Sequence, residues 1–118
     1  MLLELGANDA LRGLDPAATF ANLDAMLARL RELGIPALVA GMLAPPNMGP
    51  EYANAFRDLF PRLADARGVA LYPFFLDGVA AEPTLLQGDG MHPNVRGVAV
   101  IVERILPYVL RTLAAKAD

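Results

Sequence analysis

Apolar residues follow two alternating patterns along the chain: short continuous runs of strand length, and longer stretches with one apolar helical face. Continuous runs occupy residues 1–5, 36–42 and 69–74, and unalternating runs of this kind suit parallel strands covered on both faces. Elsewhere, apolar residues recur three and four positions apart, as on one side of a helix. These helical stripes are Phe20, Leu23, Leu27 and Leu30, then Tyr52, Phe56, Leu59 and Leu63, and finally Val98, Val102, Ile105 and Val109. The alternation predicts parallel strands joined by right-handed helical crossovers.

Prolines and capping residues indicate where these helices begin and where they are disturbed. Asp15 followed by Pro16 is typical of a helix start, with Asp as the cap and Pro in the first turn. Pro61 and Pro107 fall inside the second and third stripes, so we expect a kink or break at the first and a bend at the second. Residues 44–50 are rich in proline and predict a loop without regular structure.

The number of predicted strands is small for a doubly wound domain, which usually has about five. Three parallel strands would leave unpaired backbone groups along the outer strands. We therefore expect an α/β fold with about three parallel strands and helices on both faces, in which residues 1–118 form the C-terminal portion of a larger domain. The chain is 55% hydrophobic, yet no apolar run approaches the roughly 18 residues that cross a bilayer. Either the domain buries an unusually large share of its surface, or some apolar faces meet a partner, and we favour the second.

Several kinds of chemistry are excluded by what the sequence lacks. It has no cysteine and no serine, and its single histidine is His92. Disulfides, thiolate nucleophiles and multi-histidine metal sites are therefore excluded within one chain, and no cofactor is expected. The net charge of −3 offers no basic surface for nucleic acid. The only side-chain hydroxyls belong to Thr19, Thr84, Thr112 and three tyrosines, so any serine-based reaction must use residues from outside this chain.

Polar residues follow the predicted strands at the sheet edge where open parallel sheets bind ligands. Residues 6–9 leave the first strand, residues 43–50 leave the second, and a loop at 89–92 reaches the same edge before the last helix. Asp89 and His92 are three residues apart around a glycine, so a tight turn could place the carboxylate beside the imidazole Nδ1–H and leave Nε2 as a general base. The same residues could equally form an ordinary Asp-Gly turn that opens a helix.

The sequence alone leaves two roles open for Asn8 at this edge. The side-chain amide of Asn8 could act as an oxyanion donor, or Asn8 and Asp9 could simply cap the next turn through the backbone. Pro93 and Asn94 would hold the histidine-bearing loop against the start of the last helix.

Taken together, these residues resemble the SGNH (GDSL) hydrolase family, most closely its acyl-CoA thioesterase, arylesterase and lysophospholipase branch. Residues 6–9, Gly-Ala-Asn-Asp, match the family's third block, Gly-x-Asn-Asp. Residues 89–93, Asp-Gly-Met-His-Pro, match its fifth block, Asp-x-x-His-Pro. Segments 43–47, 52–56 and 71–75 are similar to that branch in the same order, so the resemblance covers essentially the whole chain. It implies a flavodoxin-like three-layer fold.

The resemblance also implies a reaction and a set of residues. His92 would be the general base, Asp89 its orienting acid, and Asn8 one oxyanion donor. The substrate-binding residues it implies are Gly6, Asp9, Leu43, Pro45 and Pro46. The substrate would be a small carboxylic ester or thioester, hydrolysed through an acyl-enzyme.

The family's first block, Gly-Asp-Ser, and its second block find no counterpart in this sequence and would precede Met1. The first carries the nucleophile and the second an oxyanion glycine, so we expect this chain to be inactive alone. The missing central strand pairs, in the family's strand order, with the strand at residues 1–5. That strand is therefore expected to pair with the missing N-terminal segment or with a second copy. Relatives in this branch are often exported, which favours a periplasmic or secreted location for a full-length relative and leaves the compartment of this chain open.

Two other functions remain open. The chain could be a non-catalytic α/β module that buries its open edge by self-association. Alternatively, it could be an enzyme that uses Thr84 or Asp9 together with His92.

Overall fold

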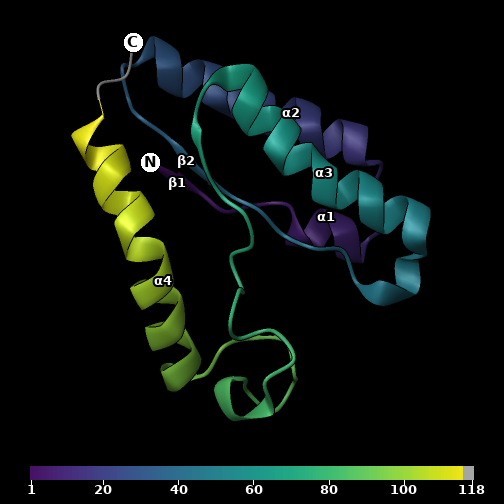
Figure 1. The fold of residues 1–118 in the computed structure, drawn as a ribbon. Helices are drawn as coiled ribbons and strands as arrows, with labels where there is room; N and C mark the ends of the chain where they lie inside the picture. The colour runs from purple at the N-terminus through teal and green to yellow at the C-terminus, as the bar shows by residue number, and fades with distance from the viewer. Residues whose placement is uncertain (116–118) are drawn as a thin grey trace.

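In the computed structural model, which describes residues 1–115, three short parallel strands form one sheet with helices on both faces (Figure 1). The strands are β1 (Leu2–Leu3), β2 (Leu38–Ala40) and β3 (Ala70–Tyr72), in the spatial order β1-β2-β3. The helices are α1 (Ala7–Leu11), α2 (Pro16–Glu32), α3 (Pro50–Arg67) and α4 (Val95–Ala114), with 3-10 turns η1 (Pro46–Met48) and η2 (Pro83–Leu85). The predicted α/β fold with three parallel strands is confirmed.

Helices α2 and α3 lie side by side over one face of the sheet (Figure 1). As predicted, Asp15 caps α2, accepting a hydrogen bond from the Ala17 N–H at 3.0 Å, and Pro16 is in the first turn. The helix ends before Gly34, whose φ of 70° is the left-handed conformation that glycine adopts easily. The core between these helices and the sheet is made by Leu3, Ala10, Leu23, Leu27, Ala37, Val39, Phe56, Leu59, Phe60 and Leu63.

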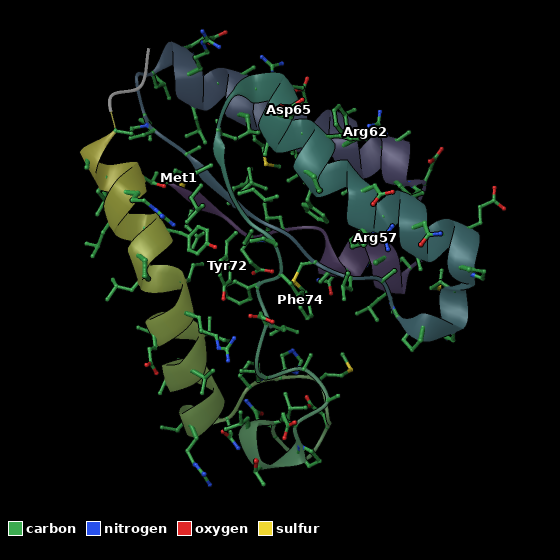
Figure 2. The ribbon with its side chains drawn as sticks, in the orientation of Figure 1. Met1, Arg57, Arg62, Asp65, Tyr72 and Phe74 are labelled. Atoms are coloured by element: carbon green, nitrogen blue, oxygen red, sulfur yellow. The ribbon has the colours of Figure 1, made fainter. Side chains whose placement is uncertain are left out.

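Helix α4 lies on the opposite face, against β2 and β3 (Figure 1). Because side chains alternate along a strand, Val39 enters the core under α2 and α3, whereas its neighbour Leu38 joins a second, smaller core with Tyr72 and Ile105. The Tyr72 ring points toward α4 and meets the Tyr108 ring edge-on, with centroids 4.9 Å apart (Figure 2). On the far side of the molecule, Arg57, Arg62 and Asp65 lie along the exposed side of α3.

The two interior prolines do not break their helices, so of the kink or break expected at Pro61 the break does not occur. Helix α3 runs through Pro61 and α4 runs through Pro107. Both prolines are exposed, so the backbone carbonyl that each leaves without a helical partner can bond to water.

Other differences from the sequence prediction are local. Residues 6–9, expected in a loop after the first strand, lead into α1, because the Ala10 and Arg12 N–H groups reach the carbonyls of Gly6 and Asn8 at 3.1 and 3.0 Å. The loop at 44–50 contains the 3-10 turn η1. The strands are shorter than the apolar runs that predicted them.

The apolar face predicted for the last helix is only partly buried. Ile105 is in the core and Val109 packs against it, but Val98 and Val102 are exposed, and the buried face is completed instead by Ile101 and Thr112. Exposed apolar residues form a second stripe with the same spacing, the outer stripe of α4: Val95, Val98, Val102, Leu106, Leu110 and Leu113. A surface helix normally has one apolar face. Helix α4 has two, and the described residues cover only one of them.

Candidate active site

The turn that carries the single histidine is organised around one carboxylate. Oδ1 of Asp89 accepts the N–H groups of Met91 and His92 at 2.9 and 3.0 Å, and Oδ2 lies 2.5 Å from Nδ1 of the His92 ring. Gly90 has φ 70°, the left-handed conformation this turn requires. One side chain therefore fixes both the backbone of the turn and the imidazole.

The ionisation of Asp89 decides which ring nitrogen is available. The hydrogen bond from the His92 ring, followed by those from the His92 and Met91 backbone, holds the pKa of the Asp89 carboxyl well below its usual range. An ionised carboxylate only accepts hydrogen bonds. Nδ1 must therefore carry the hydrogen, which leaves Nε2 as the nitrogen free to take a proton. The His92 side chain is 67% exposed, so Nε2 lies at an accessible surface.

Asn8 lies in α1, directly after β1 at the carboxyl edge of the sheet. Gly6 has φ 119°, which lets the chain turn from the strand into this short helix. Asn8 is exposed, and a hollow beside it is lined by residues of the β1–α1 segment and of α2, among them Glu4 and Met26. Burial raises the pKa of the Glu4 carboxyl. The side-chain amide of Asn8 has no hydrogen-bond partner among residues 1–115.

Asp9 has a different environment from its neighbour. Its Oδ2 accepts the hydroxyl of Thr19 at 2.8 Å, and Thr19 is buried on α2. The Tyr52 hydroxyl donates to the Leu14 carbonyl at 2.6 Å just beyond α1. These bonds anchor α1 on α2 and α3, so Asp9 fixes the segment that presents Asn8. The sequence contained no local signal for the Thr19 contact, since the partners are ten residues apart on different helices.

Three of the substrate-binding residues implied by the resemblance, Leu43, Pro45 and Pro46, lie on the loop between β2 and α3. Leu43 and Pro46 are exposed, and Pro45 is half-buried. The loop leaves β2 at Gly41, whose position has no room for a side chain, because a Cβ there would lie 2.1 Å from the Pro73 carbonyl oxygen. The structure thus presents apolar side chains beside the carboxyl edge of the sheet.

The structure brings Asp89 and His92 together but does not join them to Asn8. No hydrogen bond links the two segments among the described residues. Figure 1 shows α1 and the segment between η2 and α4 in separate parts of the molecule, the first beside α2 and α3 and the second beyond the end of β3. Within residues 1–115, no group of three or more Asp, Glu and His side chains could hold a metal ion, and no helix is long and apolar enough to cross a membrane.

Comparison with known proteins shows the family of the chain. The GDSL-like lipase/acylhydrolase family matches residues 1–100. The chain is 35% identical over 113 residues to an arylesterase of Vibrio mimicus, covering 96% of this chain and 56% of that protein. It is 38% identical over 94 residues to thioesterase 1/protease 1/lysophospholipase L1 of Escherichia coli, covering 80% of this chain and 45% of that protein. The crystal structure of TesA superposes with a TM-score of 0.88 at 37% identity, covering 94% of this chain and 62% of that one.

These matches define the class of the protein as an SGNH hydrolase by fold and sequence. The chain belongs to the GDSL-like lipase/acylhydrolase family. It spans about half the length of the curated relatives it matches.

Proposed function

We propose that this chain supplies the acid–base and oxyanion part of an esterase or thioesterase active site whose serine comes from outside these 118 residues. The observation that carries the proposal is the 2.5 Å contact between Oδ2 of Asp89 and Nδ1 of His92, whose side chain is 67% exposed. The names of the relatives, an arylesterase and a thioesterase/lysophospholipase, support ester and thioester substrates.

In the proposed reaction, Nε2 of His92 takes the serine proton as the serine oxygen attacks the acyl carbon. Asp89 stabilises the imidazolium that forms, and Asn8 donates a hydrogen bond to the tetrahedral oxyanion. The imidazolium then protonates the departing alcohol or thiol, which leaves an acyl-enzyme. Water attacks that ester with His92 again acting as the base, and the carboxylic acid is released. Gly6 and Asp9 shape the Asn8 segment, while Leu43, Pro45 and Pro46 line the acyl side.

The surface left uncovered indicates what kind of segment brings the serine. Leu2 pairs in register with Leu38, so both side chains point to the α4 face, yet Leu38 is 1% exposed and Leu2 is 43% exposed. A further strand beside β1 would pair with the open edge of β1. If that added strand ran parallel to β1, it would end at the carboxyl edge of the sheet beside Asn8, where a nucleophile is needed.

The handedness of strand connections supports a position for the rest of that proposed segment. The steps β1 to β2 and β2 to β3 both pass over the face of α2 and α3, as right-handed crossovers in one direction require. If the strand next to β1 is followed by a helix that leads to a second strand farther out, that step runs in the opposite direction, and its helix would lie on the other face, beside α4. A strand–helix unit would therefore cover Leu2 and the outer stripe of α4 together.

The alternative nucleophiles gain no support from the geometry. The Asp9 carboxylate is occupied by Thr19. Thr84 offers its backbone carbonyl to the Asn94 side chain, and no hydrogen bond joins its hydroxyl to His92 among the described residues. A serine from another segment remains the function that this arrangement supports best.

The decisive experiment joins the part of TesA that precedes the matched region to residue 1 of this chain and measures hydrolysis of a p-nitrophenyl ester and an acyl thioester. We expect the fusion to hydrolyse both and the 118-residue chain alone to hydrolyse neither above background. His92→Ala in the fusion should lower kcat by about 10⁴-fold or more, as loss of a triad member does. Arg29→Ala, on the exposed side of α2, is the matched control and should leave the rate unchanged.

Three outcomes would overturn the proposal. Hydrolysis by the chain alone that disappears in His92→Ala would show that Thr84, Asp9 or another group of this chain is the nucleophile. A folded fusion whose rate is independent of His92 would place the reaction elsewhere. A stable dimer of the chain alone, with a fusion that is inactive, would favour the non-catalytic module.

A further inference from the structure

One side chain beside the histidine-bearing turn, that of Asn94, hydrogen-bonds in two directions. Its Oδ1 accepts the Gly97 N–H at 2.9 Å, which caps the start of α4. Its Nδ2 donates in the other direction, to the carbonyls of Thr84 at 3.0 Å and Leu86 at 3.3 Å. The amide therefore bridges the helix and the segment before the turn.

Backbone contacts extend the same attachment on both sides of the turn. The Asn94 N–H donates to the Leu85 carbonyl at 3.0 Å, and the Gln87 N–H donates to the His92 carbonyl at 2.7 Å. Helix α4 can approach this closely only because residue 97 is glycine: a Cβ there would lie 2.2 Å from the Leu85 carbonyl oxygen. The turn is thus a short loop whose two ends are fastened to each other and to α4.

We propose that Asn94 is a positioning residue that sets the orientation of the His92 ring through its two Nδ2 hydrogen bonds; the catalytic meaning of this role rests on the proposed function. Asp89 joins His92 within the turn but makes no hydrogen bond to α4 among the described residues. Among the described residues, the Asn94 side chain hydrogen-bonds both to α4, through Gly97, and to the segment before the turn, through Thr84 and Leu86. A general base must be held within a few tenths of an ångström of its proton donor, roughly 0.5 Å, to be effective.

The two ends of the Asn94 side chain can be separated by substitution. Asn94→Asp keeps an oxygen that caps α4 and loses both Nδ2 donors. Asn94→Ser also keeps a capping oxygen and adds no charge, whereas Asn94→Ala loses the cap as well. If the cap alone matters, only the alanine variant should change the turn. If the donors matter, all three should.

The single histidine gives a direct readout in the 118-residue chain, without any need for activity. Ring ¹⁵N signals and the Nδ1–H proton of His92 are recorded at about pH 8, where an ordinary imidazole is neutral. We expect the native chain to show one tautomer, with the hydrogen on Nδ1. In Asn94→Asp and Asn94→Ser we expect mixed tautomers and at least tenfold faster exchange of the Nδ1–H proton, with helix content by circular dichroism unchanged.

Asp15→Ala is the matched control, because it removes the corresponding cap from α2, far along the chain from the turn. It should leave the His92 signals as they are. The proposal is overturned if Asn94→Asp and Asn94→Ser keep the native signals, or if Asp15→Ala changes them as much. A variant that loses its helix content also contradicts the proposal, since it would make Asn94 a residue of overall stability.

Activity in the TesA fusion separates this inference from the proposed function. If the fusion is active, Asn94→Asp should lower kcat about tenfold or more with KM little changed, because binding the ester does not need an oriented base. If the fusion is inactive while the Asn94 variants still alter the His92 signals, the positioning role stands and the proposed function fails.

Discussion

The two faces of the sheet are covered to different degrees. On the face of α2 and α3, Leu3, Val39 and Leu71 of the three strands all enter one continuous core. On the face of α4, only the part over β2 and β3 is closed: Leu38 is buried, while its partner Leu2 on β1 lies open. The face under α2 and α3 is covered along all three strands. On the other face, no described residue covers Leu2 of β1 or the outer stripe of α4.

This difference also separates the parts of the candidate site. Asn8 belongs to α1, which is fastened to the complete side through Asp9 and Thr19. Asp89 and His92 belong to a turn fastened to α4, the helix that is half covered. Under the proposed function, the added strand would end beside the Asn8 segment and the added helix would lie beside α4, so folding of the added segment and assembly of the site would be coupled.

The largest effect expected from this comparison is on stability. Leu63→Ala on α3 removes a side chain that is fully buried and should lower the free energy of unfolding by about 2–5 kcal/mol. Leu106→Ala on α4, at a side chain 46% exposed, should change it by no more than about 0.5 kcal/mol. Urea denaturation of the two variants beside the native chain measures both.

A large loss of stability in Leu106→Ala would show that the outer stripe of α4 is already buried in solution, for instance against a second copy. Repeating the titration at several protein concentrations distinguishes these cases, because only an assembly has a stability that depends on concentration.

The sequence predicted the covered side well because its signals are local. Continuous apolar runs predicted the strands, and apolar stripes with helical spacing predicted α2 and α3. The capping role of Asp15 could be predicted from two adjacent residues, Asp15 and Pro16. It predicted α4 poorly, since Val98 and Val102 obey helical spacing on a face that no described neighbour covers. Periodicity reports which residues share a side of a helix, and cannot tell which of two apolar sides is packed.

In the candidate site too, the local contact could be predicted from the sequence and the contacts between helices could not. Asp89 and His92 lie three residues apart, so their proximity needed only a turn around Gly90. The contact of Asp9 with Thr19 depends on how α1 lies on α2, which no pattern in the sequence encodes. The distance from the Asn8 segment to the histidine depends in the same way on tertiary arrangement.

A smaller effect should be seen on assembly. Leu106→Glu places a charge in the outer stripe of α4 and should weaken binding of the separately prepared leading part of TesA at least tenfold, about 1.4 kcal/mol, because a buried unpaired charge is costly. Arg96→Glu introduces the same residue at an exposed position of α4 outside the stripe and should have little effect. Isothermal titration calorimetry gives both affinities, and equal affinities would show that the added segment does not use the stripe.

The smallest effect expected concerns the acid range of the covered side. Arg67 on α3 makes two hydrogen bonds to Asp24 on α2, at 2.6 and 2.8 Å, and these lower the pKa of the Asp24 carboxyl. Because the folded pKa lies below the unfolded value of about 3.9, the pair stabilises the fold above that pH and the contribution is lost as the pH falls through the folded pKa. Asp24→Asn should therefore lower the urea midpoint near neutral pH and converge with the native chain in acid.

The matched control for that pair is the one between Arg29 and Glu32 within α2, where both side chains are about two-thirds exposed. Exposed pairs of this kind contribute little, so Glu32→Gln should leave the midpoint almost unchanged at every pH. Asp24 and Arg67 are each only about one-third exposed and join two different helices. If Asp24→Asn and Glu32→Gln gave the same pH profile, the contact between α2 and α3 would owe its stability to the apolar core alone.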